Sequence, residues 1–249
     1  MKSRPLLLCT ALFALATLAR ATVTETFKQT YPLAADGTLQ LDNVNGDIDI
    51  VAWDKAEVSL EAEKKGKTDE DLAKVTLEID SSPAKLSIKT KYAKKDGWLS
   101  GSVNASVRYK LMVPAGAHLQ KIDSVNSDIT VTGVRGSVNL DTVNGSITAT
   151  GLAADARLGS VNGSLRAEFA SLDGVQKVKL DSVNGRTSVA LPKGAGARID
   201  ADSVNGSVNI DQAVKLGKVR RHSLSGQIGS GGPDISLETV NGSISIKEN

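Results

Sequence analysis

The sequence is poor in aromatic residues and contains a single cysteine, and both shortages limit what the chain can be. Phe, Tyr and Trp make up only 3% of the 249 residues, whereas 40% of the residues are hydrophobic. Since aromatic side chains normally supply much of the area that a rounded core buries, we predict a thin core of Val, Ile, Leu and Ala. The share of charged residues, 23%, is that of a globular chain and excludes disordered, collagen-like and coiled-coil proteins.

The only cysteine, Cys9, lies in a segment with the features of a secretory signal peptide. Basic residues precede an apolar run over 6–18, and Ala19-Arg20-Ala21 supplies the small residues of a cleavage site. The run is shorter than the roughly 20 residues that a transmembrane helix needs. We therefore predict a signal peptide over 1–21 and an exported chain, in the periplasm or the extracellular medium, without disulfides and without a transmembrane segment after cleavage.

Removal of the signal peptide also removes the apparent excess of basic charge. The remaining chain has 27 Lys and Arg against 28 Asp and Glu. A nearly neutral chain does not favour nucleic acid as a partner. No spacing of His or Cys is typical of a metal site, and we predict no metal and no cofactor.

A repeat of about twenty residues dominates the sequence. Each copy carries Val-Asn-Gly or a close relative of it, and the copies after residue 120 follow one another at intervals of 16 to 22 residues. The gap of 81 residues between Asn45 and Asn126 has room for about four further units, so we predict about eleven units in all. The asparagines of the copies are Asn45, Asn126, Asn144, Asn162, Asn184, Asn205 and Asn241, and Leu224-Ser225-Gly226 is a divergent copy.

Hydrophobic and polar residues alternate on both sides of the tripeptide, which predicts two short strands per unit, each with one inward face. Leu140, for example, lies four residues before Asn144, and Ile147 lies three residues after it. We expect the glycine to take a positive φ at the corner. We also expect the asparagine amides, and a column of hydroxyls two positions before them, to form hydrogen bonds along the stack. The hydroxyl column comprises Ser124, Thr142, Ser160, Ser182, Ser203, Ser223 and Thr239.

Two all-β architectures fit these columns. In the first, each unit is one coil of a single-stranded parallel β-helix, or β-solenoid, which pairs with the coils above and below it. In the second, each Asn-Gly closes a two-residue hairpin, which gives stacked β-hairpins or a β-sandwich. We favour the β-helix, because the core is thin and because Gly133, Gly151 and Gly174 mark a second corner between successive Asn-Gly corners.

We predict one domain after the signal peptide, spanning 22–249. Its first part, 22–115, is irregular and bears most of the aromatic residues, whereas 116–249 holds the regular repeats. The aromatic residues of the first part are Phe27, Tyr31, Trp53, Tyr92, Trp98 and Tyr109.

A bacterial β-strand-repeat family of unknown function, labelled "putative adhesin", resembles this chain in two stretches. These are the units from Ile122-Asp123-Ser124-Val125-Asn126-Ser127-Asp128-Ile129 onward and the preceding Leu111-Met112-Val113-Pro114-Ala115-Gly116. The resemblance is clearest from Val107 to Ile246 and implies an exported β-helical domain with no known enzymatic activity. It carries over no catalytic or binding residue, because the family has no established site motif.

Acidic residues recur three positions before the asparagine and are candidates for chemistry. In stacked units they form a carboxylate row, interrupted at Gly159 and His222. Such a row suits Ca²⁺, which takes several oxygen ligands, but it also suits a solvated column bonded to the backbone beside the turn, and we favour the solvated column. The row consists of Asp42, Asp123, Asp141, Asp181, Asp202 and Glu238.

An enzyme is the competing functional class, because parallel β-helices include polysaccharide lyases and hydrolases. Hydrolysis of a glycosidic bond needs two carboxylates about 5 to 9.5 Å apart, which stacked aspartates could supply. The C-terminal repeats, however, show no departure that would build a cleft, and His118 and His222 lie in no spacing typical of a triad or a metal centre. We therefore predict a protein that is not an enzyme.

A loop-like segment in the irregular part combines four lysines, two aromatic residues and two glycines. In one interpretation Tyr92, Lys94, Lys95 and Trp98 bind an anionic polysaccharide by stacking and ion pairing. In the other, which we favour for Trp98, the indole caps the core and the lysines are merely solvated. Lys64-Lys65-Gly66-Lys67 is a second basic turn, which we interpret as an ordinary hairpin tip.

The sequence thus predicts an exported, adhesin-like binding or scaffolding module whose partner is an envelope polysaccharide or a cell-surface protein. The alternatives are a carbohydrate-active enzyme on the same fold and a filament unit that stacks end to end. A groove with two facing carboxylates and a nearby Lys or Arg would favour the enzyme.

Overall fold

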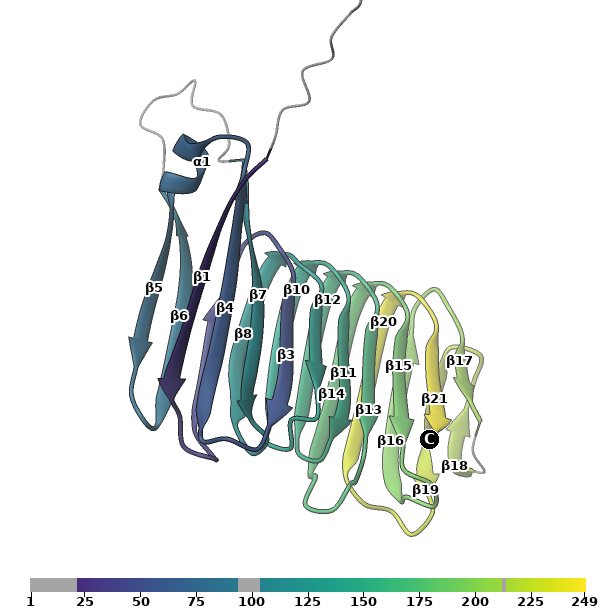
Figure 1. Ribbon diagram of the computed structural model, residues 1–249. Helices are drawn as coiled ribbons and strands as arrows, with labels where there is room; N and C mark the ends of the chain where they lie inside the picture. The colour runs from purple at the N-terminus through teal and green to yellow at the C-terminus, as the bar shows by residue number, and fades with distance from the viewer. Residues whose placement is uncertain (1–21, 94–103, 212–213) are drawn as a thin grey trace, which may run out of the picture.

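The computed structural model describes residues 22–93, 104–211 and 214–249, and the strands of this part form two β-sheets (Figure 1). Sheet I has ten strands, in the spatial order β1 (Val23–Pro32), β4 (Glu57–Gly66), β7 (Ala105–Pro114), β3 (Ile48–Trp53), β9 (Ile129–Thr132), β11 (Ile147–Leu152), β13 (Leu165–Phe169), β15 (Thr187–Leu191), β21 (Ile244–Glu248) and β17 (Val208–Ile210). Sheet II has eleven, in the order β18 (Val214–Val219), β19 (Ser223–Ile228), β16 (Ala197–Ser203), β20 (Asp234–Asn241), β14 (Lys177–Asn184), β12 (Ala156–Asn162), β10 (Val138–Asn144), β8 (His118–Asn126), β2 (Thr38–Asp42), β6 (Lys85–Tyr92) and β5 (Val75–Ser81). The described part has one helix, α1 (Asp69–Ala73), so the all-β prediction is confirmed.

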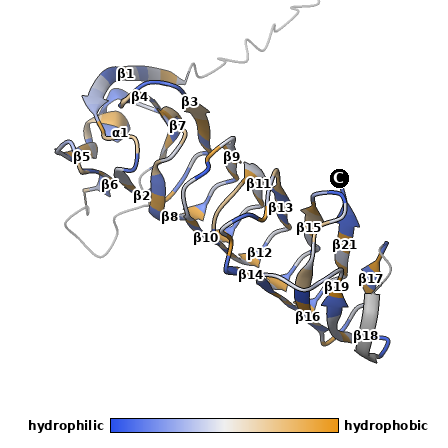
Figure 2. Ribbon diagram, turned by 90° about the horizontal axis from the view of Figure 1, so that it is seen from below, coloured by the Kyte–Doolittle hydropathy of each residue, from blue (hydrophilic) through white to orange (hydrophobic). Residues whose placement is uncertain are grey.

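The two sheets face each other across one narrow core, as two rows of strands in Figure 2. Inward residues such as Leu140 and Ile147 are fully buried, and the core is aliphatic apart from a few aromatic side chains, of which Tyr109 and Phe169 are fully buried. No helix of the described part combines the length and the hydropathy needed to cross a membrane.

Strand pairing is parallel in the middle of both sheets and antiparallel at the N-terminal end of both. At the other end, sheet II is antiparallel, whereas the β21–β17 pair of sheet I is parallel. Parallel register runs from β8 through β10 and β12 to β14, and from β9 through β11 and β13 to β15. Antiparallel pairs occur at β1–β4, β4–β7, β5–β6, β16–β19 and β18–β19. The sheets are therefore mixed, and parallel pairing throughout was a wrong expectation. The hairpin alternative is also wrong for the repeats, because β10 and β11, on either side of Asn144-Gly145, belong to different sheets.

The spatial order of the units differs from their order in the chain. The last two strands, β20 and β21, lie between β14–β15 and β16–β17 (yellow among green in Figure 1). The amide of Asn126 also bonds directly to that of Asn45, so the long gap before Asn126 inserts no further rung between these two. The prediction of about eleven units is thus wrong. In the intervening chain, β6 and β7 pair in parallel with β2 and β3, and β4 and β5 form antiparallel pairs at the N-terminal end of the molecule.

A ladder of seven asparagine side chains runs along one corner of the molecule and fixes the register of the units. In each step the Nδ2 of one asparagine donates to the Oδ1 of its neighbour over 2.7 to 2.9 Å, as predicted. In spatial order the rungs are Asn45, Asn126, Asn144, Asn162, Asn184, Asn241 and Asn205.

The hydroxyl column and the corner glycines differ from expectation. The hydroxyls of the column are buried except that of Ser223. Most of them bond to a backbone carbonyl of the neighbouring rung: Ser160 Oγ, for instance, donates to Gly145 O over 2.9 Å. The glycine of most rungs has no positive φ. It is needed because a Cβ on Gly163 would overlap the same carbonyl oxygen of Gly145. The second corner does use positive φ, at 76° for Gly133.

Candidate functional site

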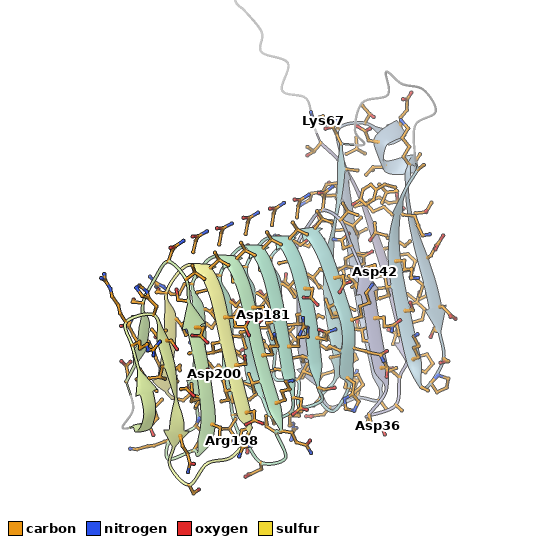
Figure 3. All side chains as sticks on the ribbon, turned by 180° about the vertical axis from the view of Figure 1, so that it is seen from behind. Asp36, Asp42, Lys67, Asp181, Arg198 and Asp200 are labelled. Carbon is orange, nitrogen blue, oxygen red and sulfur yellow. The ribbon has the colours of Figure 1, made fainter. Side chains whose placement is uncertain are left out.

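The acidic column lies on the outer face of sheet II, where parallel register aligns Asp42 with Asp123 and continues the row across the strands (Figure 3). The Nζ of Lys121 lies 2.9 Å from Asp42 Oδ1 and 3.0 Å from Asp123 Oδ2. Lys179 bridges a second acidic pair of the row in the same way. These lysines neutralise the carboxylates and favour a solvated ion-pair network over a calcium row. Within the described ranges, no three His, Cys, Asp or Glu side chains are placed to hold a metal ion.

The row is interrupted at Gly159 on β12, and the neighbouring Asp141 on β10 fills the space. A Cβ on Gly159 would overlap Asp141 Oδ1. Burial raises the pKa of Asp141 above the usual value of an aspartate, the charge of Asp123 raises that pKa further, and Arg157 opposes both effects. On the other side of Gly159, Asp181 lies 3.8 Å from Arg157 and is paired with Lys179. The two acids flanking the gap thus have different environments.

Two hollows adjoin on this face and share Arg157. One, of about 370 Å³, lies over the beginnings of β8, β10, β12 and β14. The other, of about 540 Å³, lies over the ends of β10, β12, β14, β20 and β16. We call the two together the β12 trough. Polar side chains that line it include Gln120, Asn139, Asp141, Arg157, Lys179 and Asp181.

A row of exposed valines borders the trough, next to the asparagine ladder. These side chains precede the ladder asparagines, and their exposed fractions run from 38% to 66%. Val161, Val183 and Val204 also line the larger hollow. The row offers an apolar rim beside the charged floor. Its exposed members are Val125, Val143, Val161, Val183, Val204 and Val240.

The structure places one of the four binding residues predicted from the sequence. Tyr92 ends β6, is half-buried and packs against the core. Burial raises the pKa of its hydroxyl, and the nearby backbone of Asn45 lowers it. Lys94, Lys95 and Trp98 lie outside the described residues, so their binding role stays a prediction.

Sequence reasoning missed the basic and amide side chains of the trough. Arg157, Lys179 and Asn139 occupy outward positions whose residue type changes from unit to unit, so no column revealed them. The one sequence feature that could have indicated the trough was the interruption of the acidic row at Gly159. The histidines form no catalytic arrangement: His118 Nδ1 lies 2.9 Å from Ser137 Oγ, and His222 Nδ1 contacts Gly206 O.

Comparison with known proteins identifies relatives of the whole fold. A family model described as Toastrack DUF4097 matches residues 32–247. A search of curated proteins found no match. The chain is similar to a crystal structure of a "putative cell adhesion protein" from Clostridium sporogenes, with 15% identity and a TM-score of 0.52 over 92% of this chain and 100% of that one. It is less similar to a "putative adhesin" from Bacteroides fragilis, with 12% identity and a TM-score of 0.41 over 90% of this chain and 97% of that one. The first likeness shows a shared fold.

Proposed function

The chain belongs to the Toastrack DUF4097 family, and from this premise we propose that it is an exported, adhesin-like binding module that is not an enzyme. The name of the Clostridium sporogenes protein, whose fold it shares, supports a role in adhesion. The central units are then coils of a parallel β-solenoid, an interpretation that the parallel register of β8 to β15 supports. The solenoid presents a long, regular surface to a partner.

The ligand we propose is an envelope polysaccharide bound along the β12 trough, and the observation that carries this proposal is the trough itself. Amide and charged side chains such as Asn139, Arg157 and Lys179 line it, and these groups donate hydrogen bonds to sugar hydroxyls and to acidic sugars. The valine rim contacts the apolar faces of sugar rings. With strands rising about 3.3 Å per residue, five to seven residues along β12 give a length of roughly 20 Å, which suits a chain of several sugars.

An array of bacterial envelope glycans tests this function, with Arg157→Ala as the variant. Arg157 lines both hollows and is half-exposed, so its loss should spare the fold. Because a charge-assisted hydrogen bond contributes about 1.5 to 3 kcal/mol, affinity should fall at least about tenfold. Arg198→Ala is the matched control: Arg198 lies on the same sheet and is paired with Asp234, but it does not line the trough.

Equal loss of binding in the two arginine variants would contradict a site in the trough. Retention of glycan binding by Arg157→Ala would do the same. If neither the native protein nor the variants bind any glycan, the polysaccharide proposal fails, and capture of a purified surface protein by the native chain becomes the next test.

One observation favours a second candidate, a glycoside hydrolase. Asp141 and Asp181 lie two strands apart, about 9.6 Å at the usual spacing, which is near the upper limit for an inverting pair. The raised pKa of Asp141 suits a general acid, while Asp181 is paired with Arg157 and Lys179. Release of reducing ends from a bound polysaccharide, abolished by Asp141→Asn, would establish the enzyme. Binding without release supports the module.

A further inference from the structure

The asparagine ladder is polar, and its donor end lies at the N-terminal end of the molecule. In every step the Nδ2 belongs to the rung farther from Asn45 and the Oδ1 to the rung nearer to it. All seven amide dipoles therefore point the same way, as the peptide dipoles of a helix do. Asn45 is the last rung. Its Oδ1 accepts from Asn126, and because the rungs repeat one geometry, its Nδ2 points away from the ladder.

A pocket of about 580 Å³ lies at this end of the ladder and is lined by Asn45. Lys65 and Lys67 bring positive charge to it, and Ser106 brings a hydroxyl. None of the described residues that line the pocket is acidic. Figure 3 labels Lys67 at this end of the molecule. The prediction of a hairpin tip at Lys64 to Lys67 is wrong, because Lys64 to Gly66 end β4 and the chain continues into α1. This segment lies against the donor end of the ladder.

Among the described residues, nearby carboxylates pair with one of the two lysines of the pocket and leave the other free. Lys65 Nζ is 2.9 Å from Glu63 Oε1, so this ammonium is shared. Lys67 is exposed and forms no ion pair within the part of the chain that the structure describes. The acidic first turn of α1, Asp69 to Asp71, follows Lys67 in the chain but does not line the pocket.

The interior next to Asn45 contains a buried polar side chain, so this end of the core is not purely hydrophobic. Asn43 is only 5% exposed, and its Nδ2 donates to the carbonyls of Asn45, Gly46 and Val107. Its Oδ1 is buried without a hydrogen-bond partner among the described residues. Such groups normally bond to a water or a ligand.

We propose that this pocket binds a phosphate group, held by the Asn45 amide, the Ser106 hydroxyl and the ammonium groups of Lys65 and Lys67. A phosphate offers three or four strong acceptor oxygens, which matches donors that converge from several directions better than the two oxygens of a carboxylate do. The site is separate from the β12 trough and does not depend on a polysaccharide ligand. The phosphate belongs either to a free anion or to a lipid headgroup.

The test titrates the purified protein with inorganic phosphate, by calorimetry and by the NMR resonances of the Asn45 side-chain amide. A second arm measures sedimentation with vesicles of phosphatidylcholine, with and without phosphatidylglycerol. Lys67→Gln and Lys65→Gln should each weaken binding about tenfold, and added salt should weaken it further. Lys193→Gln is the control, because Lys193 is an exposed lysine of a distant turn.

Phosphate binding that shifts the Asn45 amide and weakens in both pocket variants, but not in Lys193→Gln, supports the site with a free anion as its ligand. Vesicle binding that requires phosphatidylglycerol and weakens in the same variants supports it with a lipid as the source. Binding to neither probe overturns the proposal. Binding that the pocket variants and the control reduce equally overturns it too, because it then reflects net charge alone.

Discussion

Glycine occurs at two kinds of corner in this molecule, for two different physical reasons. At the asparagine corners, successive backbones approach so closely that a Cβ on Gly163 would overlap the carbonyl oxygen of Gly145. At the second corners the chain takes a left-handed conformation, with φ of 81° at Gly174, where a Cβ would meet open space. The first requirement is steric and the second is conformational, so the two kinds of position should respond differently to alanine.

Gly163→Ala should destabilise the protein by about 3 kcal/mol or more, because two backbones must move apart to admit the methyl group. Gly174→Ala should cost only about 1 to 2 kcal/mol, the strain of a left-handed alanine. Urea unfolding of the two variants measures the difference. Equal losses would show that the neighbouring rungs can move apart at little cost to admit the methyl group.

The half-buried Asp141 should make stability depend on pH. The pKa of Asp141 is raised in the folded state. Between the usual aspartate pKa and this raised value, the folded state therefore binds more protons than the unfolded state does. The free energy of unfolding falls as pH rises through this window. Asp141→Asn should therefore raise the free energy of unfolding at neutral pH, by less than about 1 kcal/mol because the group is partly solvated. The gain should vanish below about pH 4. Thermal unfolding at both pH values is the measurement, and a variant less stable at neutral pH would show instead that ion pairing with Arg157 dominates.

At the scale of the element, the ladder joins strands of neighbouring units outside the backbone pairing. Asn162 donates to Asn144 and accepts from Asn184, at 2.9 and 2.8 Å. Asn205, the terminal rung, has one such bond, to Asn241. The rungs thus differ in the number of side-chain hydrogen bonds that one substitution removes.

Asn162→Ala should cost about 2 kcal/mol and Asn205→Ala about half as much, because each hydrogen bond contributes roughly 0.5 to 1.5 kcal/mol. Chemical unfolding of the two variants tests the ratio. A smaller loss at the interior rung than at the terminal one would mean that water replaces the exposed hydrogen bonds between the amides at no cost.

The local features of these elements could be predicted from the sequence, because they follow from the side chains of one unit. The buried Leu140 and Ile147, the Asn144 rung and the corner at Gly133 were all predicted from alternation and spacing. The charged floor of the trough could not be predicted, since Arg157 meets Asp181 only through the pairing of β12 with β14. When all units carry the same columns of buried side chains, one unit can pair with several others at nearly the same free energy.

The same degeneracy explains the largest difference between chain order and spatial order in the whole molecule. β14 pairs with β20, matching Leu180 to Leu237. Yet β16 is the next strand of sheet II along the chain, and its buried and exposed residues alternate in a similar way. β16 then pairs with β20 on its other side, matching Ala201 to Leu237. The unit of β20 and β21 therefore separates two units that precede it in the chain. The contacts of β16 and β17 with the rest of the solenoid depend on that unit.

A chain that ends at Pro233 tests this dependence. Among the described strands, β17 pairs with β21 alone, and without β20 and β21 the strand β16 keeps β19. We therefore expect β16 to β19 to lose protection from hydrogen exchange while β8 to β13 keep theirs. Exchange measured by mass spectrometry on the truncated and full-length chains resolves these segments. If β16 and β17 stay protected after the truncation, they must dock directly on β14 and β15, and the units would be interchangeable. In that case the position of the last unit would reflect the lengths of the loops around it, and the side chains of its strands would play no part in the choice.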